Sequence, residues 1–434
     1  MKNIKWISLQ PLTGGMYLGF KEAFQCDAHA IISYHGLTSH SEGTIRHPRG
    51  RSGNEYNLMK YLYDHGSRVP RWEFSGKSMF SPDVNDATLV ADSMFNDEDA
   101  GPDFSNVDVV CAVPVCSGLS ALTATAQESK DEKNCNMQAL AKYALQVIKP
   151  KVYVFENAPM MVSSRGAKLR IWFEDLALRE GYTVSYFKTD TVLHHNCQRR
   201  PRTFVMMTKW DGDERRSAPD FNDYEQVTYT MKEYLKMIPE DASLQDSLPV
   251  PLYENETTIG FMKEKYPDTW RDWFAGNVIN KMIVNGMTEE FYIWCMKRGD
   301  SFGQRMMRHI VHVRECLEKG KGWWSSVPIY HKEFAPAVQS RTMYSTIHPT
   351  EDRLCSERDM LWMMGMPHDF EMQGSFMSDG KKIGQNVPVK TARWIAQYIK
   401  TVIDGWDDIR RDSTCSPRMF DNINKEEIQY IKST

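Results

Sequence analysis

The chain has 434 residues, of which 41% are hydrophobic and 25% are charged, the ordinary balance of a soluble globular protein. This length predicts two or three domains, and the lack of any run of about eighteen apolar residues excludes a membrane span. The first residues carry too short an apolar run for a signal peptide, so we expect a cytoplasmic protein. The net charge of −4 gives no general affinity for nucleic acid, although a local basic cleft would still attract phosphates.

Short apolar runs alternate with helix-period segments over residues 1–210. Strands are expected at 5–9, 107–113, 151–155, 181–187 and 202–207, and helices at 138–148 and 167–180. A glycine pair, Gly14 and Gly15, follows the first expected strand. This alternation favours an α/β fold, with a parallel sheet and helices on both faces. Ligands of such folds bind beyond the carboxyl ends of the strands.

The composition and the hydrophobic pattern change over residues 211–345, where Trp and Met are common and strand alternation fades. We interpret this segment as an inserted, irregular second domain. Residues 346–404 look helical again, above all at 391–400, and 405–434 form a polar tail. Within the insert, basic residues recur at helical spacing, which indicates either a solvated helix face or a DNA-facing surface; they are Arg305, Arg308, His309, His312 and Arg314.

Cys116 stands out among nine cysteines, none of which forms a CxxC pair. It lies in the loop Pro114-Val-Cys116-Ser117-Gly, directly after the expected strand 107–113. A cysteine there faces a cleft at the carboxyl edge of the sheet, although a buried inert cysteine is the commoner case. No cluster has metal-ligand spacing, so we expect no metal.

Two further polar segments end or begin strands. Glu156 and Asn157 follow the expected strand 151–155, where they face the same edge or cap a helix. Gln198, Arg200 and Arg202 alternate before the strand 202–207, and this period of two puts both arginines on one side. A solvated basic strand entry is the alternative interpretation.

Taken in order, these segments resemble the motifs of the DNA cytosine-5 methyltransferases. The matching strings are Pro114-Val-Cys116-Ser, Glu156-Asn-Ala158, Gln198-Arg-Arg200-Pro-Arg202, Ile347-His-Pro with Arg353, Arg358-Asp359, Met364-Gly-Met-Pro367, and Ile383-Gly-Gln-Asn-Val-Pro388. The resemblance covers about 107–210 and 340–400 well and residues 1–106 poorly. It implies a diverged member of the family, from a bacterium, a phage or a phage-infected cell.

The resemblance implies a Rossmann-like, S-adenosylmethionine-dependent catalytic domain over 1–210 and 346–404, with 211–345 inserted as a small target recognition domain. A monomer would bind double-stranded DNA and flip out a cytosine, and Cys116 would attack C6 of that base. Glu156 would hold or protonate N3, while Arg200 and Arg202 would bind the base and its phosphate. Other expected substrate contacts are Pro114, Ser117, Asn157 and Gln198.

The cofactor motifs match less well. The resemblance places S-adenosylmethionine against Gly14, Gly15, Glu55, Pro114, Gln385, Asn386 and Val387. An acid that binds adenine is expected among Asp97, Glu98 and Asp99. The family's Asp-Leu-Phe-x-Gly-x-Gly-Gly reads Ser8-Leu-Gln-Pro-Leu-Thr-Gly14-Gly15 here, so the acid, the aromatic residue and one glycine are missing. Gln385 also replaces the family's Asn, and Ser117 its Gln.

These departures leave several alternatives open. Within the same chemistry, the enzyme could transfer a modified group from an altered cofactor, act on RNA, or be weakened. A non-catalytic DNA-binding relative would keep the fold without the reaction. A cysteine hydrolase is a remote alternative because no His follows where it would pair with Cys116.

Overall fold

The structure is a computed structural model. It describes residues 3–34, 54–78, 81–92, 95–96, 101–115, 119, 131–210, 226–240, 255–298, 301–320, 329–339, 345–374, 376–406 and 418–421. Within these ranges, no helix is both long and apolar enough to cross a bilayer.

A nine-stranded sheet forms the centre of the larger body, in the order β15-β7-β10-β6-β5-β1-β2-β3-β4. Its strands are β1 (Trp6–Leu9), β2 (Ala30–Tyr34), β3 (Arg71–Phe74), β4 (Leu89–Ala91), β5 (Val109–Ala112), β6 (Val152–Asn157), β7 (Tyr182–Asp190), β10 (Pro201–Lys209) and β15 (Arg418–Asp421). The five expected strands are thereby confirmed, within a few residues at their ends.

One expectation about the sheet was wrong, because it is mixed rather than parallel. β10 runs antiparallel to both β6 and β7, and β4 runs antiparallel to β3. A parallel pair needs a crossover of a dozen or more residues, usually a helix. The connection from β7 to β10 has only a 3₁₀ turn (Thr191–Leu193) and the short strands β8 (His194–Asn196) and β9 (Gln198–Arg199), so the chain returns antiparallel.

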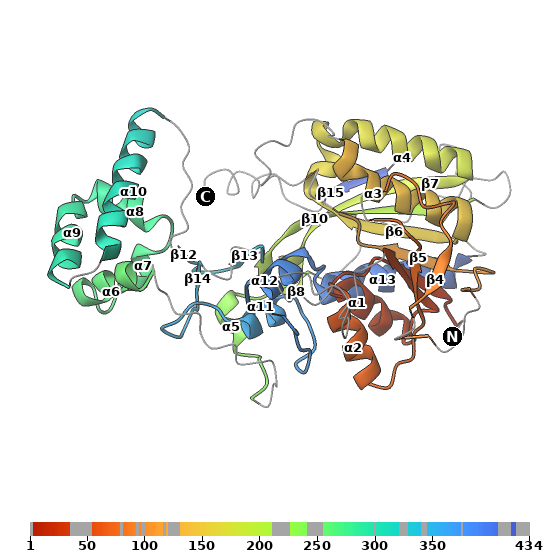
Figure 1. Ribbon diagram of the computed structural model, residues 1–434, viewed down its shortest axis with the longest axis horizontal. Coiled ribbons are helices and arrows are strands. Elements are labelled where there is room, and N and C mark those ends of the chain that lie inside the picture. The colour runs from red at the N-terminus through yellow and green to blue at the C-terminus, as the bar shows by residue number, and fades with distance from the viewer. Residues whose placement is uncertain are drawn as a thin grey trace.

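Helices cover both faces of the sheet (Figure 1). One face carries α1 (Gly15–Phe24), α2 (Tyr56–Asp64) and α13 (Val389–Asp404). The other carries α3 (Asp131–Lys142), which continues as the π-helical turn η1 (Tyr143–Ile148), and α4 (Ala167–Glu180). The bounds of α4 are those expected from the sequence. The α/β Rossmann-like architecture is therefore confirmed.

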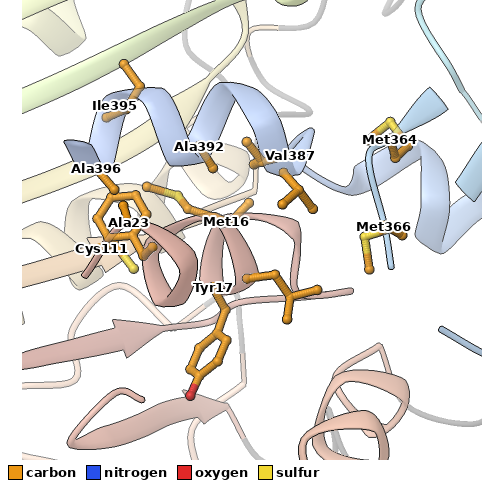
Figure 2. Close-up of a cluster of buried hydrophobic side chains, with 14 of the residues drawn as sticks. Met16, Tyr17, Ala23, Cys111, Met364, Met366, Val387, Ala392, Ile395 and Ala396 are labelled. Carbon is orange, nitrogen blue, oxygen red and sulfur yellow. The ribbon is translucent and has the colours of Figure 1, made fainter. Parts of the chain in front are cut away.

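The contact between α1 and α13 joins an early and a late part of the chain. Figure 2 shows Met16, Ala23, Ala392 and Ala396 among the apolar side chains between them. At Gly19, an added Cβ would lie 2.5 Å from the main-chain oxygen of Val389, so only glycine permits this approach. α1 and α13 therefore form one packed unit.

A helical lobe lies apart from the sheet in Figure 1. Its helices are α6 (Asn255–Lys265), α7 (Trp270–Trp273), α8 (Val278–Val284), α9 (Thr288–Lys297) and α10 (Ser301–Glu318). They share a separate apolar core, to which Ile347 and Leu354 also contribute. The prediction of an irregular insert was wrong for these residues, because amphipathic helices bury a common face.

Shorter elements connect the lobe to the sheet. They are α5 (Met231–Leu235), α11 (Glu357–Met363), α12 (Phe376–Gln385), β11 (Val227–Thr228), β12 (Ile329–Tyr330), β13 (Ala335–Pro336) and β14 (Thr346–Ile347). β11, which precedes the lobe, pairs with β8, and β13, which follows it, pairs with β9. The segments on both sides of the lobe therefore lie beside the β7–β10 connection.

Candidate active site

The loop that leads into Cys116 and the end of β6 leave the sheet side by side. β5 and β6 are parallel neighbours, and Ala112 pairs with Phe155. Val113–Val115 and Glu156 therefore follow at the same carboxyl edge. Cys116 and Ser117 lie outside the described residues, so their predicted roles stay predictions. The structure brings the residues just before Cys116 beside the strand end that carries Glu156.

Glu156 and Arg202 form the central ion pair of this edge. The Nε atom of Arg202 lies 2.6 Å from Oε1 of Glu156, and the Glu156 side chain is 5% exposed. Burial raises the pKa of Glu156, while the charges of Arg202 and Arg200 oppose that rise. The charges of both arginines therefore reach Glu156, while their predicted contacts with the base and its phosphate stay predictions. A carboxyl group with a raised pKa is suited to hold or deliver a proton.

Arg200 binds main-chain carbonyls, in contrast to Arg202, which pairs with Glu156. It is buried, and its guanidinium donates to the main-chain oxygens of Val338, Gly384 and Asn386 at 2.7 to 2.9 Å. These oxygens belong to the chain that returns from the lobe and to the loop after α12. The Arg200 guanidinium thus joins the β9–β10 turn to both segments, with its terminal nitrogens on protein carbonyls.

Gln198 and Asn157 also make structural contacts. Nε2 of Gln198 donates to the main-chain oxygen of Met363 at 3.2 Å, and its Oε1 accepts the N–H of Val338 at 2.8 Å. Oδ1 of Asn157 accepts the N–H of Ala158 at 2.8 Å. Both side chains are fully buried. The arrangement favours support of the loops, and their predicted substrate contacts stay predictions.

The glycine turn after β1 is held by the loop after α12. The N–H of Gly15 donates to Oδ1 of Asn386 at 2.7 Å, and the N–H of Gly14 donates to the oxygen of Pro11 at 3.0 Å. An added Cβ at Gly15 would lie 1.8 Å from the main-chain oxygen of Val387. The structure therefore brings together four expected cofactor residues, while both glycine N–H groups have protein partners.

Glu55 anchors a buried ion network at the edge of β2. Its Oε1 accepts from the hydroxyl of Ser33 at 2.6 Å, and its Oε2 lies 3.2 Å from Nε of Arg71. Nη1 of Arg71 also contacts Glu73 and Asp92, at 2.5 and 2.7 Å. Burial is the largest cause of a raised pKa at Glu55, and Arg71 opposes it. A helix, α2, starts directly after Glu55.

Sequence reasoning missed Arg71, although a signal was present. Arg71 and Glu73 alternate with apolar residues in a short strand, and a charge inside a buried strand requires a partner. Glu73 lies on the same strand, whereas Glu55 and Asp92 come from other segments, which a single sequence does not connect.

One further expected cofactor residue, Gln385, lies near this network. Oε1 of Gln385 accepts from Nδ2 of Asn54 at 3.2 Å, so the loop after α12 reaches the residue before Glu55. Gln385 is exposed, and Pro114 is buried. Asp97, Glu98 and Asp99 lie outside the described residues, so the adenine contact stays a prediction.

The loop after β1 fits a polar ligand. Gln10 stands where the family carries an aromatic residue, and Leu12 stands at the position of the missing glycine; their φ values are 49° and 55°. The left-handed backbone is thus kept without glycine. Gln10 is fully buried, and its Nε2 has no hydrogen-bond partner among the described residues. Such an orphaned donor at the ligand-binding edge suits an acceptor on a bound cofactor.

No group of three His, Cys, Asp or Glu side chains that could hold a metal ion occurs in the described part of the chain.

Solved structures show the same fold. A candidate DNA modification methyltransferase encoded within an E. coli prophage is 12% identical, with a TM-score of 0.52; the match covers 92% of this chain and 99% of that one. The methyltransferase EhMeth of Entamoeba histolytica is 11% identical, with a TM-score of 0.50, over 95% and 100% of the two chains. The mixed α/β sheet is thus a fold that these two methyltransferases share.

Sequence comparison defines the family. The profile of the C-5 cytosine-specific DNA methylases matches residues 78–401, most of the chain. A candidate type II methyltransferase of Methanocaldococcus jannaschii is 38% identical over 72 residues, which are 17% of this chain and 23% of that protein. The chain belongs to the C-5 cytosine-specific DNA methylase family, and the predicted family is confirmed.

Proposed function

We propose that this protein transfers a methyl group to C5 of a cytosine flipped out of double-stranded DNA, through a covalent bond between Cys116 and C6. The observation that carries the proposal is the buried Glu156–Arg202 ion pair beside the loop that enters Cys116. Ordinary cytosine C5 is a poor nucleophile, so an enzyme must first activate the ring. A thiolate and a proton donor placed on either side of the base do so.

The chain's own residues supply this activation. The Cys116 thiolate adds to C6, and the electron pair of the C5–C6 bond moves toward C5 and N3. Glu156 delivers or shares a proton at N3, which stabilises the enamine. Arg202 holds the Glu156 carboxyl in place and contacts the base or its phosphate. Once C5 is substituted, loss of its proton expels the thiolate and restores the aromatic ring.

Arg200 is assigned a positioning role. Its three hydrogen bonds to carbonyls fix the β9–β10 turn to the segment at Val338 and to the end of α12 and the loop after it. The backbone that carries Arg202 is therefore held in place. Gln198 acts in the same way through Val338 and Met363.

S-adenosylmethionine, when bound, would supply the methyl group as an electrophile. Gly14, Gly15, Asn386 and Val387 would shape its site, Gln10 would offer a side-chain donor, and Glu55, Pro114 and Gln385 would line the same edge. Both carboxyl oxygens of Glu55 already have protein partners, so we infer that Glu55 mainly stabilises this edge of the sheet. Transfer of a modified group stays the alternative.

We further propose that residues 211–345 serve as the target recognition domain. The helical lobe stands away from the sheet, with its own core, on the side to which the β9–β10 turn and α12 connect (Figure 1). Arg308, His312 and Arg314 are exposed on α10, which supports contact with phosphates. A monomer and a cytoplasmic location stay predictions.

The substrate is tested by methylation of matched DNA and RNA. Purified protein is incubated with labelled S-adenosylmethionine and either duplex DNA or transfer RNA, and the nucleosides are analysed by mass spectrometry. Label in deoxycytidine supports the proposal. Label only in cytidine would reassign the substrate to RNA, and cofactor binding without label would favour a non-catalytic DNA-binding relative.

A further inference from the structure

Asn136 lies where three neighbouring strands end. It is fully buried on α3, and its side chain binds residues that follow β5 and β1. Oδ1 accepts the N–H of Val115 at 2.8 Å, and Nδ2 donates to Oε1 of Gln10 at 3.0 Å. Burial raises the pKa of Tyr34, the last residue of β2, and the Asn136 side chain opposes that rise. β1 lies between β5 and β2, so the Asn136 amide joins the loops that follow two adjacent strands, next to the end of β2.

The bond to Val115 controls how the chain enters Cys116. Val115 directly precedes Cys116, and consecutive Cα atoms are about 3.8 Å apart. A hydrogen bond that holds the Val115 N–H therefore limits where the next residue starts. Misplacement of a reacting group by about 1 Å can cost on the order of 100-fold in rate.

The bond to Gln10 reaches the loop on the cofactor side. Because the Val115 N–H is a donor, Asn136 must present Oδ1 to it and Nδ2 to Gln10. Gln10 must then present Oε1, which leaves its Nε2 without a partner among the described residues. The orientation of both amides thus follows from a single main-chain N–H.

We propose that Asn136 is a positioning residue that ties the loop entering Cys116 to the Gln10 loop, so that cofactor binding and the placement of the nucleophile are coupled. The inference rests on the proposed function, because it takes Cys116 as the nucleophile. An acceptor on the cofactor that pairs with Nε2 of Gln10 would stiffen the Gln10–Asn136–Val115 chain. By reciprocity, any change that breaks the chain should also weaken cofactor binding.

The coupling can be measured without methyl transfer. Addition of Cys116 to C6 lets C5 take up a solvent proton, so in heavy water the C5 hydrogen of cytosine exchanges for deuterium. The exchange is read by mass spectrometry of nucleosides from mixed-sequence duplex DNA. It is measured with and without S-adenosylhomocysteine, whose affinity is determined separately by calorimetry.

Asn136→Leu is compared with Asn134→Leu. Asn134 lies on the same helix and is equally buried, but no described contact joins it to either loop. We expect Asn136→Leu to slow exchange by about 10- to 100-fold and to weaken S-adenosylhomocysteine binding. Asn134→Leu should leave exchange within about twofold of the parent at a similar melting temperature.

Gln10→Met breaks the Gln10–Asn136–Val115 chain of hydrogen bonds at its other end. This variant replaces Asn136→Leu in the test if Asn136→Leu does not fold. In Gln10→Met, S-adenosylhomocysteine should no longer change the exchange rate. The double variant Gln10→Met/Asn136→Ser should exchange no more slowly than Asn136→Ser alone, because both changes break the same chain of hydrogen bonds. Equal exchange in the parent, Asn136→Leu and Gln10→Met, or an equal loss in Asn134→Leu, would overturn the inference while leaving the proposed function intact. No exchange by the parent protein would overturn the covalent mechanism, and the inference with it.

Discussion

The main-chain N–H of Gly15, at the start of α1, donates at 2.7 Å to the side chain of Asn386, which lies 371 residues further along the chain. This bond closes the catalytic body across the inserted lobe. It also explains why the first glycine turn and the last motif, both weak signals alone, belong to one site.

Gly15→Ala should destabilise the protein by at least about 3 kcal/mol, because the new Cβ would overlap the main-chain oxygen of Val387. Urea unfolding measures the loss. Gly101→Ala is the matched control, since a Cβ there meets nothing within 4 Å and should change stability by less than about 0.5 kcal/mol. Equal stability of the two variants would show that the close approach of Gly15 and Val387 is wrong.

Glu156→Gln should lower kcat by about 10²- to 10⁴-fold, because an amide can bind N3 but cannot deliver a proton. The measurement is single-turnover methylation at saturating DNA. Glu174→Gln, on the outer helix α4, serves as the control and should keep the parent rate. A Glu156→Gln variant of full activity would remove Glu156 from the chemistry.

Arg71→Met should cost about 3 to 5 kcal/mol, because it leaves Glu55, Glu73 and Asp92 buried or half-buried without their shared cation. The free energy of unfolding in urea checks this. Arg68→Met changes an exposed arginine three residues earlier and should cost less than about 1 kcal/mol. If the two losses were alike, the Arg71 network would not hold the edge of β2.

The buried His194 predicts loss of stability in mild acid. Burial lowers its pKa to about 3, whereas an unfolded histidine titrates near 6.5. Below about pH 6.5 the unfolded chain therefore binds the extra proton, and stability falls by at most about 1.4 kcal/mol per pH unit from this residue. Unfolding free energies at pH 7, 6 and 5 measure the slope, which His194→Gln should flatten.

His65 should behave in the opposite sense. Its ring nitrogens lie 2.7 Å from the oxygen of Tyr61 and 2.6 Å from Oδ2 of Asp369, and these acceptors raise its pKa. Its contribution to stability is complete below the unfolded pKa and is lost as pH rises through the folded pKa. His65→Gln should therefore lose stability at pH 5 rather than at pH 9. A uniform loss at both values would contradict the assignment.

The part of the fold that follows from local pattern was predictable. The ends of α4 follow from the helical period and from Gly181, which takes the left-handed conformation that ends the helix. The placement of Arg200 and Arg202 on one side was predicted from their period of two, whereas the ion pair of Arg202 with Glu156 was not predicted. Each of these inferences needs only a short stretch of sequence.

Other features depend on contacts between distant segments. Arg71 meets partners from α2 and from the end of β4, and Asn136 joins two loops that are separated by more than a hundred residues. The antiparallel direction of β10 depends on the absence of a crossover helix, which the apolar strand pattern itself does not record. The helical lobe was missed because Trp- and Met-rich helices resemble irregular core segments in sequence.

The most direct test of the central claim uses methyl-labelled S-adenosylmethionine and duplex DNA, with the parent protein and Cys116→Ser side by side. Nucleosides from the DNA are then separated by liquid chromatography and identified by mass spectrometry. The proposed function predicts labelled 5-methyldeoxycytidine from the parent and none from Cys116→Ser. Unlabelled deoxycytidine after incubation with a parent protein that binds the cofactor, or equal labelling by both proteins, would contradict it.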